Sequence, residues 1–243
     1  MNFSKKIYGL LALVKDIFFP IKCECCNEFV ESIGLCTKCW KKIAWISDPK
    51  CRICGTPFEL DVSEICANCA QKKPFFDRGI SVFEYNDLSN GMILRFKHMD
   101  SIHLCPQFAT WMYRAGEEHI KEAELIVPVP IHLRKRLKRK YNQSELLSME
   151  ISRLSGIKYE PRILRKSKHT LQQEGLKRER REQNVIGSFD VDPQYANLLE
   201  NKKVVLIDDV FTTGATANEC SKVLKQHGAS SVTVVTLAKV VIR

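Results

Sequence analysis

Continuous apolar runs in the second half of the chain predict buried β-strands. They are Leu125–Val129, Lys203–Ile207 and Ser231–Ala238. Around them, apolar residues recur at helical spacing over Leu88–Ala115, Ser144–Leu154 and Ala217–His227. Strands that alternate with helices are typical of βαβ units, so the pattern predicts an α/β fold with a mostly parallel sheet flanked by helices.

The N-terminal segment is also apolar, but its pattern differs. The run Ile7–Pro20 is interrupted by Lys15 and Asp16, lacks a small-residue cleavage site and is too short to span a bilayer. We therefore predict an amphipathic helix over residues 1–19 that docks on the rest of the protein, with adsorption to a membrane surface as the alternative. The sequence predicts a cytoplasmic protein without stable membrane insertion, and the alternative would place it peripherally at the inner membrane.

Charge narrows the class of partner. The 243 residues include 38 Lys and Arg against 28 Asp and Glu, a net charge of +10. This excess predicts an anionic partner, either a phosphate-bearing small molecule or nucleic acid. An apolar share of 44% excludes global disorder.

Eight of the eleven cysteines form four Cys-x-x-Cys pairs: Cys23/Cys26, Cys36/Cys39, Cys51/Cys54 and Cys66/Cys69. Two residues between ligands let both sulfur atoms face one metal from a single turn, and two turns complete a tetrahedral zinc site. The sequence therefore predicts two Zn²⁺ ions.

The pairs repeat along the chain, which bears on how they combine. Cys23 and Cys51 lie 28 residues apart, and Cys36 and Cys66 lie 30 apart. Such a duplication favours sequential pairing, with the first two pairs on one zinc and the last two on the other. Cross-braced pairing is the alternative, and Cys25 is a second candidate ligand within the first pair. Asn27 and Gly55 follow the first pair of each unit, where the turn is expected to need positive φ.

The role of the metal has two interpretations. The segment Pro20–Ala70 has few large aliphatic residues, so zinc would replace a core that it cannot build. A closed four-cysteine site also leaves no position for substrate, which favours a structural role. The alternative is a zinc ribbon that contacts nucleic acid or another protein.

The segment from Val204 to Thr216 carries the candidate chemistry. An apolar strand ends in Asp208 and Asp209, a loop of hydroxyl residues and Gly214 follows, and a helix begins near Ala217. Backbone amides at a helix N-terminus suit a monophosphate, and the two carboxylates suit neighbouring sugar hydroxyls. The segment lacks both the Gly-Lys-Ser/Thr of a Walker A loop and the three glycines of a dinucleotide fingerprint.

This segment resembles the phosphoribosyl pyrophosphate (PRPP) signature of type I phosphoribosyltransferases. With the cysteine-rich module ahead of it, the chain resembles the ComF family of competence proteins from about Leu10 onward. Other similar stretches are Phe96-Lys97, Val127–Pro130, Arg139–Ser144, Gln173–Leu176, Arg181, Asn184 and Gly187–Phe189. Lys140 departs from the family, which usually has Gly there.

The resemblance implies a type I phosphoribosyltransferase-like parallel sheet over residues 75–243, preceded by a double zinc ribbon over residues 20–74. It implies that Asp208 and Asp209 hold the ribose 2′- and 3′-hydroxyls. It assigns the 5′-phosphate to Thr212, Thr213, Gly214, Ala215 and Thr216. Lys97 is a further implied contact. The resemblance also implies a pyrophosphate loop over Val127–Arg134, with contacts from Pro128, Val129 and Arg134. A lid over Lys166–Asn184, with Gln173, Arg178 and Arg181, would cover the site. Mg²⁺ would bridge the pyrophosphate and the ribose.

By the same resemblance, the chain would bind PRPP and handle single-stranded DNA during natural transformation, with a DNA-uptake helicase or recombination mediator as a further partner. The basic run His132–Lys140 suits a DNA backbone, and a solvated helix face is its alternative. The alternative function is transfer of ribose 5-phosphate from PRPP to a nitrogen base or amine. The purine branch of these enzymes has Asp where this chain has Thr212, which disfavours hypoxanthine and guanine as acceptors. The sequence identifies no catalytic base.

Overall fold

The computed structural model describes residues 21–60, 63–97, 101–131, 141–167 and 185–241. Its centre is a five-stranded sheet in the order β1-β7-β6-β2-β3, in which every neighbouring pair is parallel. The strands are β1 (Arg78–Glu84), β2 (Leu125–Pro128), β3 (Lys158–Tyr159), β6 (Lys203–Phe211) and β7 (Ser231–Lys239). The predicted α/β class, with a parallel sheet flanked by helices, is confirmed.

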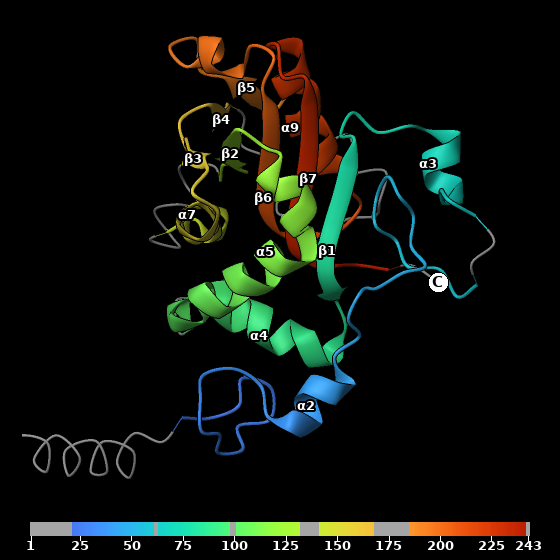
Figure 1. Cartoon of the computed structure of the whole chain (residues 1–243), viewed down its shortest axis with the longest axis vertical. Helices are drawn as coiled ribbons and strands as arrows, with labels where there is room; N and C mark the ends of the chain where they lie inside the picture. Colours follow the sequence, from blue (N-terminus) through green and yellow to red (C-terminus); the bar gives the residue numbers. More distant parts are fainter. Residues whose placement is uncertain (1–20, 61–62, 98–100, 132–140, 168–184, 242–243) are drawn as a thin grey trace, which may run out of the picture.

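Helices pack on both faces of this sheet (Figure 1). One face carries α4 (Asp87–Lys97), α5 (Cys105–Lys121) and α7 (Gln143–Ser155), whose buried residues pack with Val205, Ile207 and Val235. The other face carries α9 (Ala215–Gln226), which packs with Val204 and Leu206. A two-stranded antiparallel sheet of β4 (Leu164–Lys166) and β5 (Phe189–Val191) lies on the α9 side.

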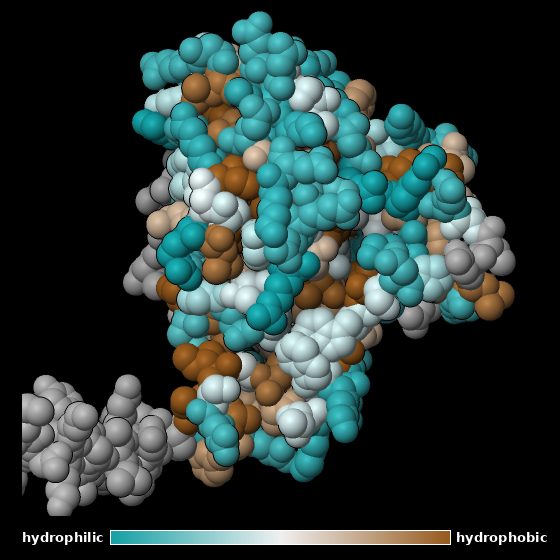
Figure 2. Space-filling model, viewed as in Figure 1, coloured by the Kyte–Doolittle hydropathy of each residue, from teal (hydrophilic) through white to brown (hydrophobic). Residues whose placement is uncertain are grey.

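The two cysteine-rich units pack on different faces. The first unit contains α2 (Thr37–Lys42), and its Ile43 and Trp45 join the core beneath α4 and α5. The second unit contains α3 (Ala67–Gln71), and its Cys51, Cys54 and Cys69 join the core on the α9 side. Figure 1 shows the first unit beside α4 and the second beyond β1, and Figure 2 shows that hydrophilic residues cover most of this side of the molecule.

Three predicted strands and two predicted helices are confirmed, with shifted ends. Strand β6 runs through both carboxylates to Phe211, because Val210 and Phe211 still pair with Ala238 and Lys239 of β7. The strand therefore ends at Phe211, four residues later than the apolar run Lys203–Ile207 predicted. Helix α9 begins at Ala215 rather than Ala217.

The helical periodicity over Leu88–Ala115 did not show that this segment is divided. The segment contains two helices, α4 and α5, with a short 3₁₀ turn at Ile102–Leu104 before the second. Pro106 lies in the first turn of α5, where its missing N–H costs nothing, whereas inside a continuous helix it would remove a hydrogen bond. Strand β1 was not predicted, although five consecutive residues of it are buried.

Candidate functional site

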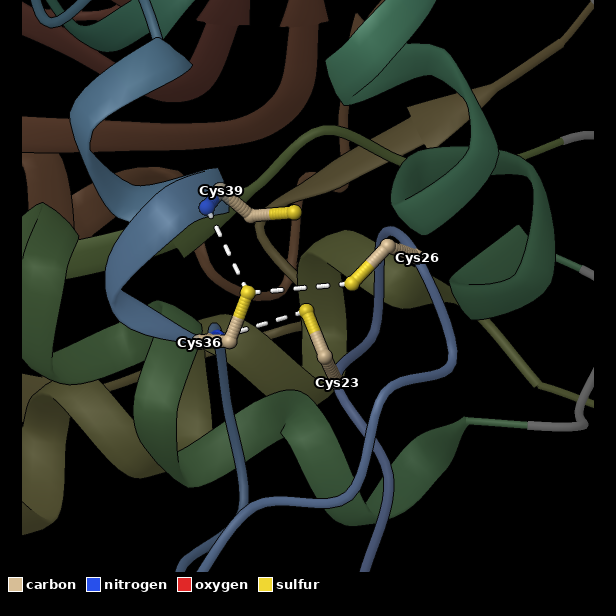
Figure 3. Close-up of side chains that lie close together, drawn as sticks. All are labelled: Cys23, Cys26, Cys36 and Cys39. Carbon is tan, nitrogen blue, oxygen red and sulfur yellow. Dashed lines mark hydrogen bonds between the residues drawn. The ribbon is translucent and has the colours of Figure 1, made fainter.

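The first metal centre brings together four thiols of residues 23–39. The sulfur atoms of Cys23, Cys26, Cys36 and Cys39 all lie within 4.8 Å of one another, and Figure 3 shows them turned toward a common centre. The Sγ atoms of Cys26 and Cys36 are 3.7 Å apart. Tetrahedral zinc with bonds of about 2.3 Å requires sulfur atoms about 3.8 Å apart, so this donor set fits zinc.

Backbone amides around this centre favour thiolates. The amides of Cys25 and Cys36 donate to Cys23 Sγ at 3.5 and 3.3 Å. Burial raises the pKa of Cys23, but the amide hydrogen bonds outweigh it and lower the pKa to about 6. Asn27 has a φ of 62°, as the sequence predicted for this turn.

The second centre repeats the arrangement with Cys51, Cys54, Cys66 and Cys69. Cys54 and Cys66 have their Sγ atoms 3.6 Å apart, and the amide of Cys66 donates to Cys51 Sγ at 3.3 Å. Burial raises the pKa of Cys51, but backbone amide hydrogen bonds lower it overall to about 7. The donor set again fits zinc.

Gly55 shows how the second centre docks on the sheet. Its φ is 69°, the positive value that the sequence predicted, and a Cβ there would lie 2.5 Å from the carbonyl oxygen of Gly79 in β1. The amide of Gly79 in turn donates to the carbonyl of Ile53 at 2.6 Å. The metal turn and the sheet edge are therefore in direct backbone contact.

Sequential pairing is confirmed and the cross-braced alternative is wrong, because each cluster contains two consecutive pairs. Cys25 is outside the first cluster. Its thiol donates to the carbonyl oxygen of Leu88 at 3.6 Å, and burial raises its pKa to about 11. Cys25 is therefore a protonated thiol between the first unit and α4.

The acidic pair lies at the carboxyl end of β6. Ser144 Oγ and the amide of Asp209 both donate to Asp208 Oδ1, at 3.0 and 2.9 Å. Lys97 Nζ lies 3.3 Å from Asp209 Oδ2. Burial, followed by the adjacent charge of Asp209, raises the pKa of Asp208 to about 7.

Residues 141–144 connect this pair to the neighbouring elements. The Tyr141 hydroxyl donates to the carbonyl of Phe96, and Gln143 Nε2 donates to the carbonyl of Lys97 at 2.9 Å. Asn142 Nδ2 donates to the carbonyl of Val129 at 3.0 Å. One short segment therefore fixes the end of α4, the end of β2 and Asp208 relative to one another.

The phosphate loop, Thr212–Ala215, follows β6 directly. Gly214 has a φ of 80°, and a Cβ there would lie 2.6 Å from Cζ of Phe211. The backbone reverses at this glycine, and α9 begins at Ala215, so the first amides of α9 lie at the loop. An anion at this helix N-terminus would be favoured by those amides and by the helix dipole.

The predicted site residues divide into three groups. Lys97, Val129, Asp208 and Asp209 lie together, linked through residues 141–144. Pro128 lies beside Ile207 in the sheet, and Thr212–Thr216 form the phosphate loop and the start of α9. Arg134 of the pyrophosphate loop and the lid residues Gln173, Arg178 and Arg181 lie outside the described residues, as does the helix predicted over residues 1–19.

A cavity that the sequence did not predict adjoins the phosphate loop. It has a volume of about 370 Å³ and lies between the second metal centre and residues Thr212–Ala215. Lys239, only 3% exposed, lines it. Burial lowers the pKa of Lys239, while the thiols of the second centre oppose that shift. A charged residue directly after the apolar run Ser231–Ala238, at the same sheet edge as Asp208, is the signal that could have identified it.

Within the described ranges, every helix is too short or too polar to cross a membrane.

Comparison with known proteins identifies the family. Residues 14–70 match the double zinc ribbon domain, and residues 148–241 match the phosphoribosyl transferase domain. "Competence protein F" of Haemophilus influenzae is 33% identical over 229 residues, which cover 91% of this chain and 98% of that protein. The chain belongs to the ComF family of competence proteins.

Other ComF relatives are more distant. "Competence protein ComFC" of Bacillus subtilis is 25% identical over 84% of each chain. The "DNA utilization protein YhgH" of Escherichia coli O6:H1 is 24% identical over 83% of this chain and 88% of that protein. Among solved structures, the allosteric regulatory enzyme of purine biosynthesis is 20% identical with a TM-score of 0.39, over 59% of this chain and 30% of that one.

Proposed function

We propose that this ComF protein binds PRPP together with Mg²⁺ and takes part in handling single-stranded DNA during natural transformation. The observation that carries the ligand assignment is the adjacency of two carboxylates and a phosphate loop at the end of one strand. Ligands of open α/β sheets bind beyond the carboxyl ends of the strands, where both features lie.

Each part has a chemical counterpart in PRPP. Asp208 and Asp209 accept hydrogen bonds from the two ribose hydroxyls, and the amides and hydroxyls of Thr212–Thr216 hold the 5′-phosphate. Lys97, already paired with Asp209, is a cation within reach of the same ligand. Mg²⁺ suits a site with two carboxylates because it keeps several waters and takes few protein ligands, and it would neutralise the pyrophosphate.

The DNA assignment is supported by the names of the relatives and by the charge. Two relatives are competence proteins and another is a DNA utilization protein. The net charge of +10 suits a polyanion. We propose that the zinc ribbons hold the fold and also offer a docking surface for a DNA-uptake helicase or recombination mediator.

The ligand assignment is tested by thermal unfolding with and without PRPP and Mg²⁺. A ligand that binds only the folded state raises Tm, and the stabilisation grows with the logarithm of the ligand concentration relative to Kd. We expect wild type to be stabilised and the double variant Asp208→Asn with Asp209→Asn to show no shift. Glu31→Gln with Glu118→Gln, which alters two exposed carboxylates by the same charge, is the matched control and should respond like wild type. An unchanged wild-type Tm in saturating PRPP would overturn the assignment.

Transfer of ribose 5-phosphate to a nitrogen acceptor is the second candidate, and the cavity beside the phosphate loop favours it by offering space for an acceptor. It requires pyrophosphate release from PRPP that depends on an added base or amine. Release that never exceeds the rate without acceptor, across a panel of bases and amines, would remove this candidate.

A further inference from the structure

The cavity beside the phosphate loop, here called the Lys239 cavity, is built jointly by the two halves of the molecule. The second metal centre contributes Cys54, Cys66 and Cys69, and the sheet domain contributes the phosphate loop and Lys239. Its volume of about 370 Å³ falls in the range of small-molecule sites and exceeds what a single phosphate needs. The phosphate loop therefore borders more space than a 5′-phosphate fills.

Lys239 is the feature that points to a ligand. Its side chain is 97% buried and lines the cavity, and its Nζ lies 3.7 Å from the centroid of the Phe211 ring. Among the described residues, no carboxylate lies within 4.0 Å of this Nζ. A buried ammonium is costly unless a partner compensates it, and the face of one ring replaces only part of its hydration.

Other lysines on the cavity wall are likewise without a carboxylate partner in the described part of the chain. Lys72 and Lys73 are exposed, and Lys222 is partly buried with its Nζ 5.9 Å from the Phe75 ring. Glu219 is the carboxylate on the wall, and it already accepts a hydrogen bond from the amide of Gly187 at 2.8 Å. The lysines therefore share the wall with one engaged carboxylate and with the thiolates of the second metal centre.

The rest of the lining combines polar side chains, such as Asn68 and Asn218, with an apolar part. Phe75, Phe76 and Phe211 contribute rings, and Ile186 and Val240 contribute aliphatic surface. A buried ammonium beside these rings fixes the orientation of a ligand that has an apolar body and one anionic group.

We infer that the Lys239 cavity binds an oxyanion carried on a planar ring, with the oxyanion at Lys239 and the ring among Phe75, Phe76 and Phe211. This inference deepens the proposed function, because it places a second ligand beside the PRPP site and makes the second zinc ribbon part of its wall. The oxyanion has two chemical sources, a ring carboxylate and a nucleotide phosphate. A ring carboxylate would occupy the cavity together with PRPP, whereas a nucleotide phosphate would compete with the 5′-phosphate of PRPP for the shared loop.

The competing explanation is that Lys239 only balances the negative charge of the second zinc centre. The two explanations differ in what the loss of Lys239 disturbs. If Lys239 is a counter-charge to the thiolates, its loss should lower zinc retention. If Lys239 binds an anion, its loss should lower the affinity for the ligand while zinc is retained.

The test measures binding of two probes, orotate and uridine 5′-monophosphate, by calorimetry to the zinc-loaded full chain. The variant is Lys239→Met, which keeps the length and the apolar contact with Phe211 but removes the charge. Lys41→Met, on the exposed face of α2, is the matched control. We expect at least one probe to bind wild type and the control with equal affinity. Lys239→Met should bind that probe at least about 10-fold more weakly and should retain two zinc ions.

Three results would overturn the inference: neither probe binds wild type at millimolar concentration, the Met variant binds as tightly as wild type, or the Met variant loses zinc in step with affinity. If the Met variant does not fold, Lys222→Met takes its place, since its partly exposed side chain leaves the core intact, and a loss of affinity is again expected. Adding PRPP to the assay then distinguishes the probes, because orotate binding should persist and nucleotide binding should fall.

Failure of the proposed function is recognised separately. The double variant Asp208→Asn with Asp209→Asn should lose PRPP and keep the probe. A chain that binds the probe through Lys239 but does not bind PRPP would retain this inference and lose the PRPP assignment.

Discussion

Ser144, the second residue of α7, donates a hydrogen bond of 3.0 Å to Asp208 Oδ1 at the end of β6, 64 positions later in the chain. The neighbours of Ser144 bind the ends of α4 and β2, so the carboxylate is positioned by one segment that also positions Lys97 and Val129. The acidic pair is therefore pre-organised by groups that lie outside the PRPP signature itself.

Replacing Ser144 by alanine should weaken PRPP binding and leave the fold intact. The hydroxyl stabilises the ionised form of Asp208, and a lost hydrogen bond to a charged group costs about 1.5–3 kcal/mol, which is an affinity loss of about 10-fold or more. Titration calorimetry with PRPP and Mg²⁺ measures the loss. Ser148→Ala, one turn further along α7, removes a buried hydroxyl without a hydrogen-bond partner in the described chain and should bind as wild type does. Equal affinities of the two variants would contradict the role of Ser144.

The ionisation of Asp208 should be visible near neutral pH. Its pKa is about 7 in the folded chain against an ordinary value of 3.8, so the folded state holds a proton that the unfolded state releases. The contribution of Asp208 to stability is therefore full below about pH 4 and is lost as the pH rises through the interval up to about 7. Carbon-13 NMR of the aspartate carboxyl groups should show a midpoint near 7, and Asp208→Asn should remove that signal. A midpoint below pH 5 would contradict the environment described for this carboxyl.

PRPP with Mg²⁺ should lower that midpoint, because ribose hydroxyls and a divalent cation both favour the carboxylate. Binding near neutral pH should then release a proton from Asp208, which is measured as a dependence of the binding enthalpy on the ionisation enthalpy of the buffer. The ligand phosphates also titrate, so Ser144→Ala serves as the comparison. In the Ser144→Ala variant, Asp208 is more protonated before PRPP binds, so binding should release a larger fraction of a proton from it.

Much of this architecture could be predicted from the sequence, and the exceptions have physical reasons. The cysteine clusters were predictable because Cys-x-x-Cys spacing is a local constraint, and strands β6 and β7 because their apolar runs are buried on both faces. The break between α4 and α5 was missed because periodicity continues across it, and only Pro106 marks the new helix. Lys239 was missed because its burial depends on residues from Cys54 to Thr213, which no local pattern connects.

The two metal centres should differ in their effect on the ligand site, although their spacing is nearly the same. Cys36→Ser and Cys66→Ser occupy equivalent positions in the two units, and each should lose one zinc ion. Only the second should impair PRPP binding, because the second centre contacts β1 through Gly79 and lines the cavity beside the phosphate loop. Zinc content and PRPP affinity measured on the same preparations decide this. Equal losses of affinity would show that both ribbons act only through the general fold.

Gly214, the glycine of the phosphate loop, should not be replaceable by alanine without loss of stability. An alanine there would hold φ at 80° and place its Cβ 2.6 Å from the ring of Phe211, which itself is fixed between Phe76 and Lys239. Backbone strain of this kind costs about 1–3 kcal/mol, and the steric contact adds to it.

Gly91→Ala is the matched control: it lies within α4, its Cβ would meet only the guanidinium of Arg95 at 3.6 Å, and alanine favours a helix by about 1 kcal/mol. Thermal unfolding should therefore lower Tm for Gly214→Ala and raise or preserve it for Gly91→Ala. A Gly214→Ala protein as stable as wild type, with unchanged PRPP affinity, would show that the loop has room to relax around Phe211 and that its left-handed turn is dispensable.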